Sequence, residues 1–447
     1  MRDLLLLCVL LIPLAVTLRY PFVGVLTWAW FSLMTPHQMA YGVFGLPLNM
    51  VIAATTIVAV ALSGAFRHFR FDATTGLLIL FALWLCLSQL FSLDPNSSYT
   101  YFDRFIKTLI FAFLCVQLTS DRLRFHALLW MLVIAIGYFG LKGGLFTLVT
   151  LGEHRVQGLE RTILEDNNHM GVALATILPL ILYLREQSTR PLIKTGLLGL
   201  FVLDLIAVIG THSRGAFVAL MVFGAFFWFR SRRKLAILAG LALIMVPAVA
   251  FMPSKWTDRM STISEATKDA SFMGRVDAWV VNMKLAAAHP LTGAGLRNSY
   301  QKEIAQTVDM RRAESAKAAH SIYFETLGGT GFVGLAIYLA LLATAFLRAH
   351  SLQSKNRDIN DEPWIASFGY YAQIALAVFC VGGAAVSIEM WDGYWILIAL
   401  TAAAAKVASE APTLRRSGGA PAPGWRLAAR AREGFAPRRR NAAESNS

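Results

Sequence analysis

His320 and Tyr323 stand three residues apart, where a long polar segment gives way to an apolar run of helical length. Side chains three apart lie on one face of a helix, so both fall on the first turn of the helix that this run predicts. Histidine, with an ordinary pKa of about 6.5, accepts a proton readily near neutral pH. His320 therefore has two interpretations of equal standing: a general base at a membrane–water boundary, with Tyr323 as a substrate contact, or a histidine packed at a helix end. His169 and His212 compete for the role of base.

Two arginines on the same predicted side of the membrane suggest an anionic substrate. Arg214 follows Ser213, a residue type that caps helices, and opens the next apolar helix. A helix N-terminus favours anions, and a guanidinium adds two parallel donors. The pattern predicts a phosphate site at Arg214; the alternative is an arginine that reaches lipid headgroups or pairs with Glu325. Arg275 heads another predicted helix, where pairing with Asp277 is the competing interpretation.

Arg155 and Arg161 lie in a further polar connection, GEHRVQGLERTILEDNNHM, among several acidic residues. For these two arginines, anion binding and local ion pairing in a solvated loop stand as equal alternatives.

Recognisable metal-binding patterns are absent from the sequence. It contains no Asp-x-Asp pair, no HExxH and no CxxC, and carboxylates such as Asp166 and Asp392 are scattered. We therefore expect neither a metal ion nor another cofactor.

The composition is that of a membrane protein. Of the 447 residues, 56% are hydrophobic and only 15% are charged, against about a quarter in soluble domains, and the mean hydropathy is +0.54. The net charge of +14 reflects cytoplasmic loops rich in Lys and Arg, so nucleic acid is not expected as a partner. The four cysteines lie in apolar runs and are interpreted as small buried side chains.

Apolar segments predict an all-α polytopic fold with about 12 or 13 membrane-spanning helices. The expected spans are 4–18, 21–35, 46–64, 76–92, 105–119, 126–150, 168–184, 196–211, 216–229, 235–252, 320–347, 364–387 and 394–409. The first two are short and form either two spans or one bent element.

The distribution of positive charge predicts the orientation. The basic connections, which include Arg67, Arg70, Arg348 and the C-terminal tail, are expected in the cytoplasm. The opposite segments 94–103, 152–168, 211–215, 253–319 and 389–392 are expected outside, which is the periplasm if the membrane is a bacterial inner membrane.

Four regions follow from this pattern. Residues 1–252 and 320–409 form transmembrane helices, and 253–319 forms a periplasmic subdomain with helices near 275–288 and 299–317. Trp279 belongs to the helix near 275–288, where it is either part of an apolar face that packs on the membrane domain or an anchor at the membrane interface. Residues 410–447 are expected to be a disordered basic cytoplasmic tail held near anionic lipid.

Three blocks resemble the superfamily of O-antigen ligases and O-antigen polymerases (Wzy-like). They are SRGA at 213–216, GRVDAWVVNMKLAAAHPLTGAGLRNSY at 274–300 and AHSIYFETLGGTGFVGL at 319–335. Near the N-terminus, TWAWFSLMTPHQMAYG at 27–42 resembles a narrower branch, the O-glycosylation ligases associated with exosortase A systems.

The resemblance implies a GT-C-like fold and a metal-independent, inverting glycosyl transfer from undecaprenyl pyrophosphate to an acceptor hydroxyl on lipid A core or protein. It implies that Arg214 and Arg275 hold the pyrophosphate and that His320 deprotonates the acceptor. Arg155, Arg161 and Asn168 lie in a segment similar to the family's, where the arginines would add pyrophosphate contacts and Asn168 another substrate contact.

Two other functions remain open. A polymerase that extends a lipid-linked glycan shares the same charge arrangement and differs only in its acceptor. A lipid-glycan transporter would place polar groups at the bilayer midplane. Only Asp204 is clearly central within the expected spans, and the sequence shows no internal repeat.

Overall fold

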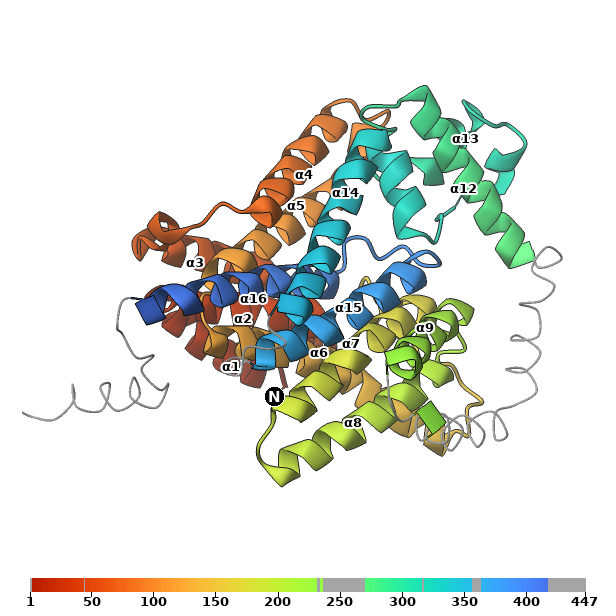
Figure 1. Cartoon of the computed structure of the whole chain (residues 1–447). Coiled ribbons are helices and arrows are strands. Elements are labelled where there is room, and N and C mark those ends of the chain that lie inside the picture. The colour runs from red at the N-terminus through yellow and green to blue at the C-terminus, as the bar shows by residue number, and fades with distance from the viewer. Residues whose placement is uncertain are drawn as a thin grey trace, which may run out of the picture.

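The computed structural model describes residues 2–43, 45–230, 234–235, 270–315, 317–355 and 363–416, and within these ranges it contains helices and no strand (Figure 1). This confirms the all-α fold class. The expected span 235–252 lies outside the described residues, apart from Leu235.

The N-terminal half consists of nine helices within the described ranges. They are α1 (Arg2–Arg19), α2 (Pro21–Met34), α3 (Leu48–Leu62), α4 (Ala73–Leu90), α5 (Pro95–Leu118), α6 (Arg122–Val149), α7 (Asn167–Gln187), α8 (Pro191–Gly210) and α9 (Arg214–Arg230). The two expected N-terminal spans are separate helices that divide at Tyr20. Pro21 lies in the first turn of α2, where a proline begins a helix but cannot continue one.

The C-terminal half contributes α12 (Ala270–Ala288), α13 (Lys302–Gln306), α14 (Ile322–Lys355), α15 (Pro363–Gly383) and α16 (Asp392–Arg416). The expected helix at 299–317 is instead broken into α13 and two 3-10 turns, η5 (Asn298–Tyr300) and η6 (Arg312–Ser315). Asp309 explains the interruption, because its side chain accepts a hydrogen bond from the backbone N–H of Arg312 and replaces a helical partner. α16 runs to Arg416, beyond the expected start of the tail; residues 417–447 are outside the described ranges.

Six described helices are long and apolar enough to cross a membrane: α4, α6, α7, α8, α14 and α15. Three shorter apolar helices, α2, α3 and α9, accompany them. The chain is therefore a multi-pass membrane protein. Within the described residues these six are fewer than the expected 12 or 13 spans. The expected spans at α2, α3 and α9 form short helices, α5 carries Asp103, Arg104 and Lys107, and the expected span 235–252 is almost entirely outside the described residues.

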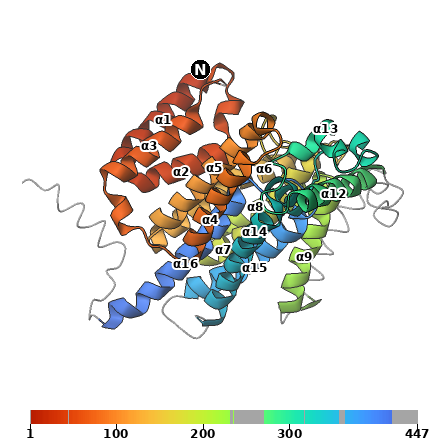
Figure 2. The same cartoon turned by 90° about the horizontal axis from the view of Figure 1, so that it is seen from above.

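The connections expected on one side of the membrane contact one another at one end of the bundle. Leu93 N–H donates to the carbonyl of Ala294, and Val156 N–H donates to that of Gly210 (both 2.9 Å). Seen from two directions, α12 and α13 lie together beside α14 (Figure 1, Figure 2).

A kink at Gly331 divides α14 into two helical segments. Gly331 has a φ of 72°, and a Cβ there would lie 2.3 Å from the carbonyl oxygen of Leu291. The close approach lets the turn after α12 complete the interrupted helix: Ala294 N–H donates to Gly328 O, and Phe332 N–H donates to Pro290 O (both 2.9 Å). Backbone groups freed by the kink are therefore paired, and the turn is fixed against α14.

Candidate functional site

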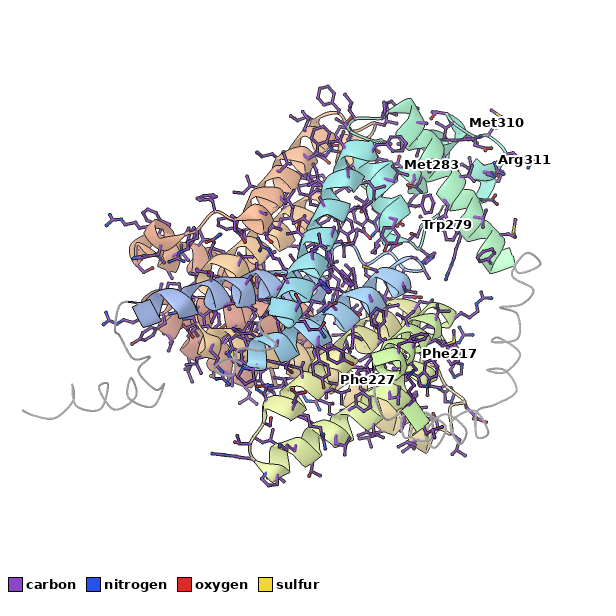
Figure 3. All side chains as sticks on the ribbon, viewed as in Figure 1. Phe217, Phe227, Trp279, Met283, Met310 and Arg311 are labelled. Carbon is purple, nitrogen blue, oxygen red and sulfur yellow. The ribbon has the colours of Figure 1, made fainter. Side chains whose placement is uncertain are left out.

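The peptide preceding His320 is held on both sides. Ala319 N–H donates to Oε1 of Glu325 (2.8 Å), and the Ala319 carbonyl accepts from Nε1 of Trp279 (2.7 Å). Trp279 projects from α12 (Figure 3). Its ring stacks on that of Phe324, with ring centroids 5.3 Å apart. His320 itself has a φ of 47°, a left-handed conformation that needs support from its surroundings.

The imidazole of His320 is half-buried and available for hydrogen bonding. Its Nδ1 is buried and has no hydrogen-bond partner among the described residues. The pKa of His320 is lowered to about 4. The largest cause is burial, the next is the positive charge of Arg275, and the third is the neighbouring His169. The ring is therefore neutral at pH 7 and has a nitrogen that can accept a proton.

His169 lies beside His320, with ring centroids 6.3 Å apart, but both its nitrogens have backbone partners. Nδ1 lies 2.8 Å from the carbonyl oxygen of Ile163, and Nε2 accepts from Ser387 N–H at 3.4 Å. This arrangement fits a packed histidine better than a free base. His212, the other competitor, is buried and also has a positive φ, 53°.

The helices that carry the two predicted phosphate-binding arginines both approach the connection between α15 and α16. Nη1 of Arg275 donates to the carbonyl of Ala385 (3.4 Å). Next to Arg214, a Cβ built at Gly215 would lie 2.8 Å from the Cβ of Ala385. Ser213 caps α9 as expected, since its Oγ accepts from Ala216 N–H (3.2 Å). Ala385 therefore lies close to the start of α9 and accepts a hydrogen bond from the Arg275 side chain of α12.

Asn168 lies at the start of α7. Its backbone N–H and its Nδ2 both donate to Oδ1 of Asp166, at 2.8 and 2.9 Å. Burial raises the pKa of Asp166, but His169 and the hydrogen bonds from Asn168 outweigh it, so the pKa lies below its ordinary value. Asn168 thus helps to keep a charged carboxylate next to His169.

No contact with His320 is described for the three remaining predicted site residues, Arg155, Arg161 and Tyr323. Arg155 and Arg161 are exposed in the connection between α6 and α7. The backbone of Arg161 donates to Glu165 Oε2 (2.7 Å) and accepts from Gln38 Nε2 (3.4 Å). Tyr323 donates its hydroxyl hydrogen to the carbonyl of Cys380 (2.8 Å), which ties α14 to α15.

The sequence did not single out Arg297, the centre of a buried charge cluster. Its guanidinium is 12% exposed, with Nη2 2.6 Å from Glu389 Oε1 and Nη1 3.6 Å from Glu325 Oε1. It also lies over the rings of Tyr101 and Tyr300. Burial disfavours its charge, but the two carboxylates prevail and raise the pKa of Arg297. Burial raises the pKa of Glu389, and Arg297 offsets part of this effect.

Glu325 connects this cluster to His320. The Oε1 atom that accepts from Ala319 N–H also accepts from the Tyr300 hydroxyl and from Ser387 Oγ (both 2.7 Å). Ser387 in turn contacts His169 through its backbone. The cue for Arg297 was present, because it is another arginine on the predicted outer side, but sequence order does not reveal its carboxylate partners.

The described residues contain no group of three or more His, Cys, Asp or Glu side chains placed to hold a metal ion. Independence from metal remains a prediction.

Two stretches of the chain match models of known protein families. Residues 199–339 match the family model for O-antigen ligase, a segment that includes Arg214, Arg275, Arg297 and His320. Residues 1–189 match a family of unknown function (DUF5935). No curated protein matches the chain. The match over 199–339 supports the O-antigen ligase superfamily and, in general terms, a membrane glycosyltransferase of the O-antigen ligase or polymerase type.

Proposed function

We propose that the protein is a ligase that transfers a complete glycan from undecaprenyl pyrophosphate to an acceptor hydroxyl, with inversion at the anomeric carbon and without a metal ion. The observation that carries the proposal is the half-buried, neutral His320, whose Nδ1 has no hydrogen-bond partner among the described residues and whose pKa is lowered in part by the charge of Arg275. The reaction takes place on the periplasmic side of a bacterial inner membrane.

His320 takes the proton of the acceptor hydroxyl. The acceptor oxygen forms a bond to the anomeric carbon while the bond from that carbon to the pyrophosphate oxygen breaks. Undecaprenyl pyrophosphate leaves with the electron pair of the broken bond. Arg214 and Arg275 offset the charge that develops on the leaving group, so positioning and electrostatics supply the catalysis. Arg155 and Arg161 are proposed as peripheral donor contacts, and Asn168 and Tyr323 as residues that line the substrate path.

Donor binding also improves the base. Arg275 is one of the causes that lower the pKa of His320. A bound pyrophosphate opposes that positive charge, and a negative group nearby favours protonated histidine. The pKa of His320 therefore rises when the donor binds, and the imidazole becomes a stronger base when there is a proton to accept.

The acceptor is proposed from the resemblance of residues 27–42 to exosortase-associated ligases, which favours a protein hydroxyl over lipid A core. The test is transfer by purified protein, with chelator present, from a lipid-pyrophosphate glycan to protein, lipid A core or a second lipid-linked glycan. Transfer to the second glycan alone would make the protein a polymerase. Movement of the donor across vesicles without any transfer would make it a transporter.

Variants test the residue roles in the same assay. Removing a general base costs on the order of 100-fold or more, which we expect for His320→Ala. Arg214→Ala and Arg275→Ala should each lower kcat/KM by about tenfold or more. His154→Ala and Arg311→Ala are the matched controls, because both side chains are exposed; Arg311 is labelled in Figure 3. Equal losses in the controls would contradict the assignment.

A further inference from the structure

A cationic cavity lies near the end of α14 that is farther from His320. It encloses about 310 Å³, which is near the lower bound of about 300 Å³ for small-molecule sites. Four helices that lie side by side, α4, α5, α14 and α16, meet around it (Figure 1, Figure 2).

The charges of the lining favour an anion. Arg70, Arg348 and Lys406 line the cavity, and Asp72 is the acidic residue among them. Asp72 and Arg348 form an ion pair of 2.5 Å. Burial raises the pKa of Asp72, but the hydrogen bonds from Thr75 and the charge of Arg348 lower it below its ordinary value. Asp72 is therefore ionised, and the lining of the cavity contains three cationic side chains and one carboxylate.

The uncharged part of the lining suits a lipid. Val116, Ala402 and Ala405 supply an apolar wall with little bulk, and Phe71, which is 75% exposed, stands at the rim. Arg70 and Arg348 belong to the connections expected in the cytoplasm. Basic pockets between transmembrane helices on that side bind the headgroups of anionic lipids.

We propose that this cavity binds the phosphate of an anionic glycerophospholipid headgroup, held by Arg70, Arg348 and Lys406, with the acyl chains in the adjoining bilayer. Bound lipid would join α14 and α16 at this end. At their other ends these helices adjoin the segments that carry His320 and Glu389. The proposal does not depend on the transfer reaction, so its test can be read without an activity assay.

The experiment measures the thermal unfolding midpoint of the full-length protein in a neutral detergent. Phosphatidylglycerol, phosphatidylcholine with the same acyl chains, and inorganic phosphate are added separately. A ligand that binds only the folded state raises the midpoint, so we expect phosphatidylglycerol to raise it by about 2 °C or more and phosphatidylcholine to leave it unchanged. Bound lipid counted by native mass spectrometry gives a second readout that does not depend on stability.

Arg70→Gln and Lys406→Gln should each lose most of the shift and of the bound lipid. Arg348 is spared, since its loss would leave Asp72 without its ion-pair partner. Arg67→Gln is the matched control: it removes one charge three residues away and leaves the cavity lining intact. Three results would overturn the proposal. They are equal shifts with both lipids, an equal shift with inorganic phosphate, and unchanged lipid binding in the two cavity variants.

Discussion

The indole N–H of Trp279 donates to the carbonyl oxygen of Ala319 at 2.7 Å, one residue before His320. The bond links helix α12 to the peptide that precedes the proposed base. On the opposite side of the same residue, the N–H of Ala319 is held by Glu325. The left-handed conformation of His320 is therefore supported by Trp279 from the distant helix α12 and by Glu325 from the helix that directly follows it.

Trp279→Phe keeps an aromatic ring against Phe324 and removes the N–H donor. A hydrogen bond contributes about 1 kcal/mol, so we expect kcat to fall by about fivefold. The KM for the donor should stay near the wild-type value, because His320 shifts while the arginines remain in place. Trp228→Phe is the matched control, because the indole nitrogen of Trp228 is buried without a hydrogen-bond partner among the described residues. A change in KM alone would contradict a positioning role.

Arg297→Gln should destabilise the protein strongly. It leaves Glu325 and Glu389 buried without their cation, and breaking a buried ion pair in this way costs about 3 kcal/mol or more. Thermal unfolding of the purified variant measures the loss. Arg311→Gln removes an exposed guanidinium from the segment between α12 and α14 and should leave the midpoint unchanged. Equal stability of the two variants would show that the cluster is not held by charge.

The pH dependence should show a histidine with a lowered pKa. The pKa of His320 is about 4 in the folded protein, and about 6.5 when unfolded. Between these values the unfolded chain binds more protons, so the stability contributed by neutral His320 is present above about pH 6.5 and lost as the pH falls toward 4. As the pH is lowered, kcat/KM should decrease with a midpoint near pH 4. The midpoint of kcat should lie at a higher pH than that of kcat/KM, because bound donor raises the pKa of His320. An acid midpoint of kcat/KM at pH 6.5 or above would contradict the lowered pKa of His320 in the free enzyme.

Gly331→Ala should destabilise the fold, because its φ of 72° and the carbonyl of Leu291 leave no room for a side chain. Strained backbone of this kind costs about 1–3 kcal/mol. Gly199→Ala is the control, since a Cβ at Gly199 meets nothing within 4 Å and alanine favours the helix. The thermal unfolding midpoint should therefore be lower than wild type for Gly331→Ala and higher than wild type for Gly199→Ala. A midpoint for Gly331→Ala equal to wild type would show that the kink tolerates a side chain.

The apolar segments predicted the helices well, because a membrane requires long apolar runs with paired backbones. The same pattern could not show that α14 turns at Gly331, since a glycine in an apolar run is compatible with a straight helix. Among the site residues, sequence reasoning selected His320, Arg214 and Arg275 from side-chain type and predicted side. It could not find the link from Glu325 to Arg297 or the one from Trp279 to Ala319, because these contacts depend on tertiary packing.

The central claim is that His320 removes the proton of the acceptor while the arginines hold the donor. The most direct measurement is a single-turnover assay on His320→Ala in which donor binding and glycan transfer are followed in the same sample. The account predicts donor binding close to that of wild type and a transfer rate lower by about 100-fold or more. Transfer at the wild-type rate would contradict it.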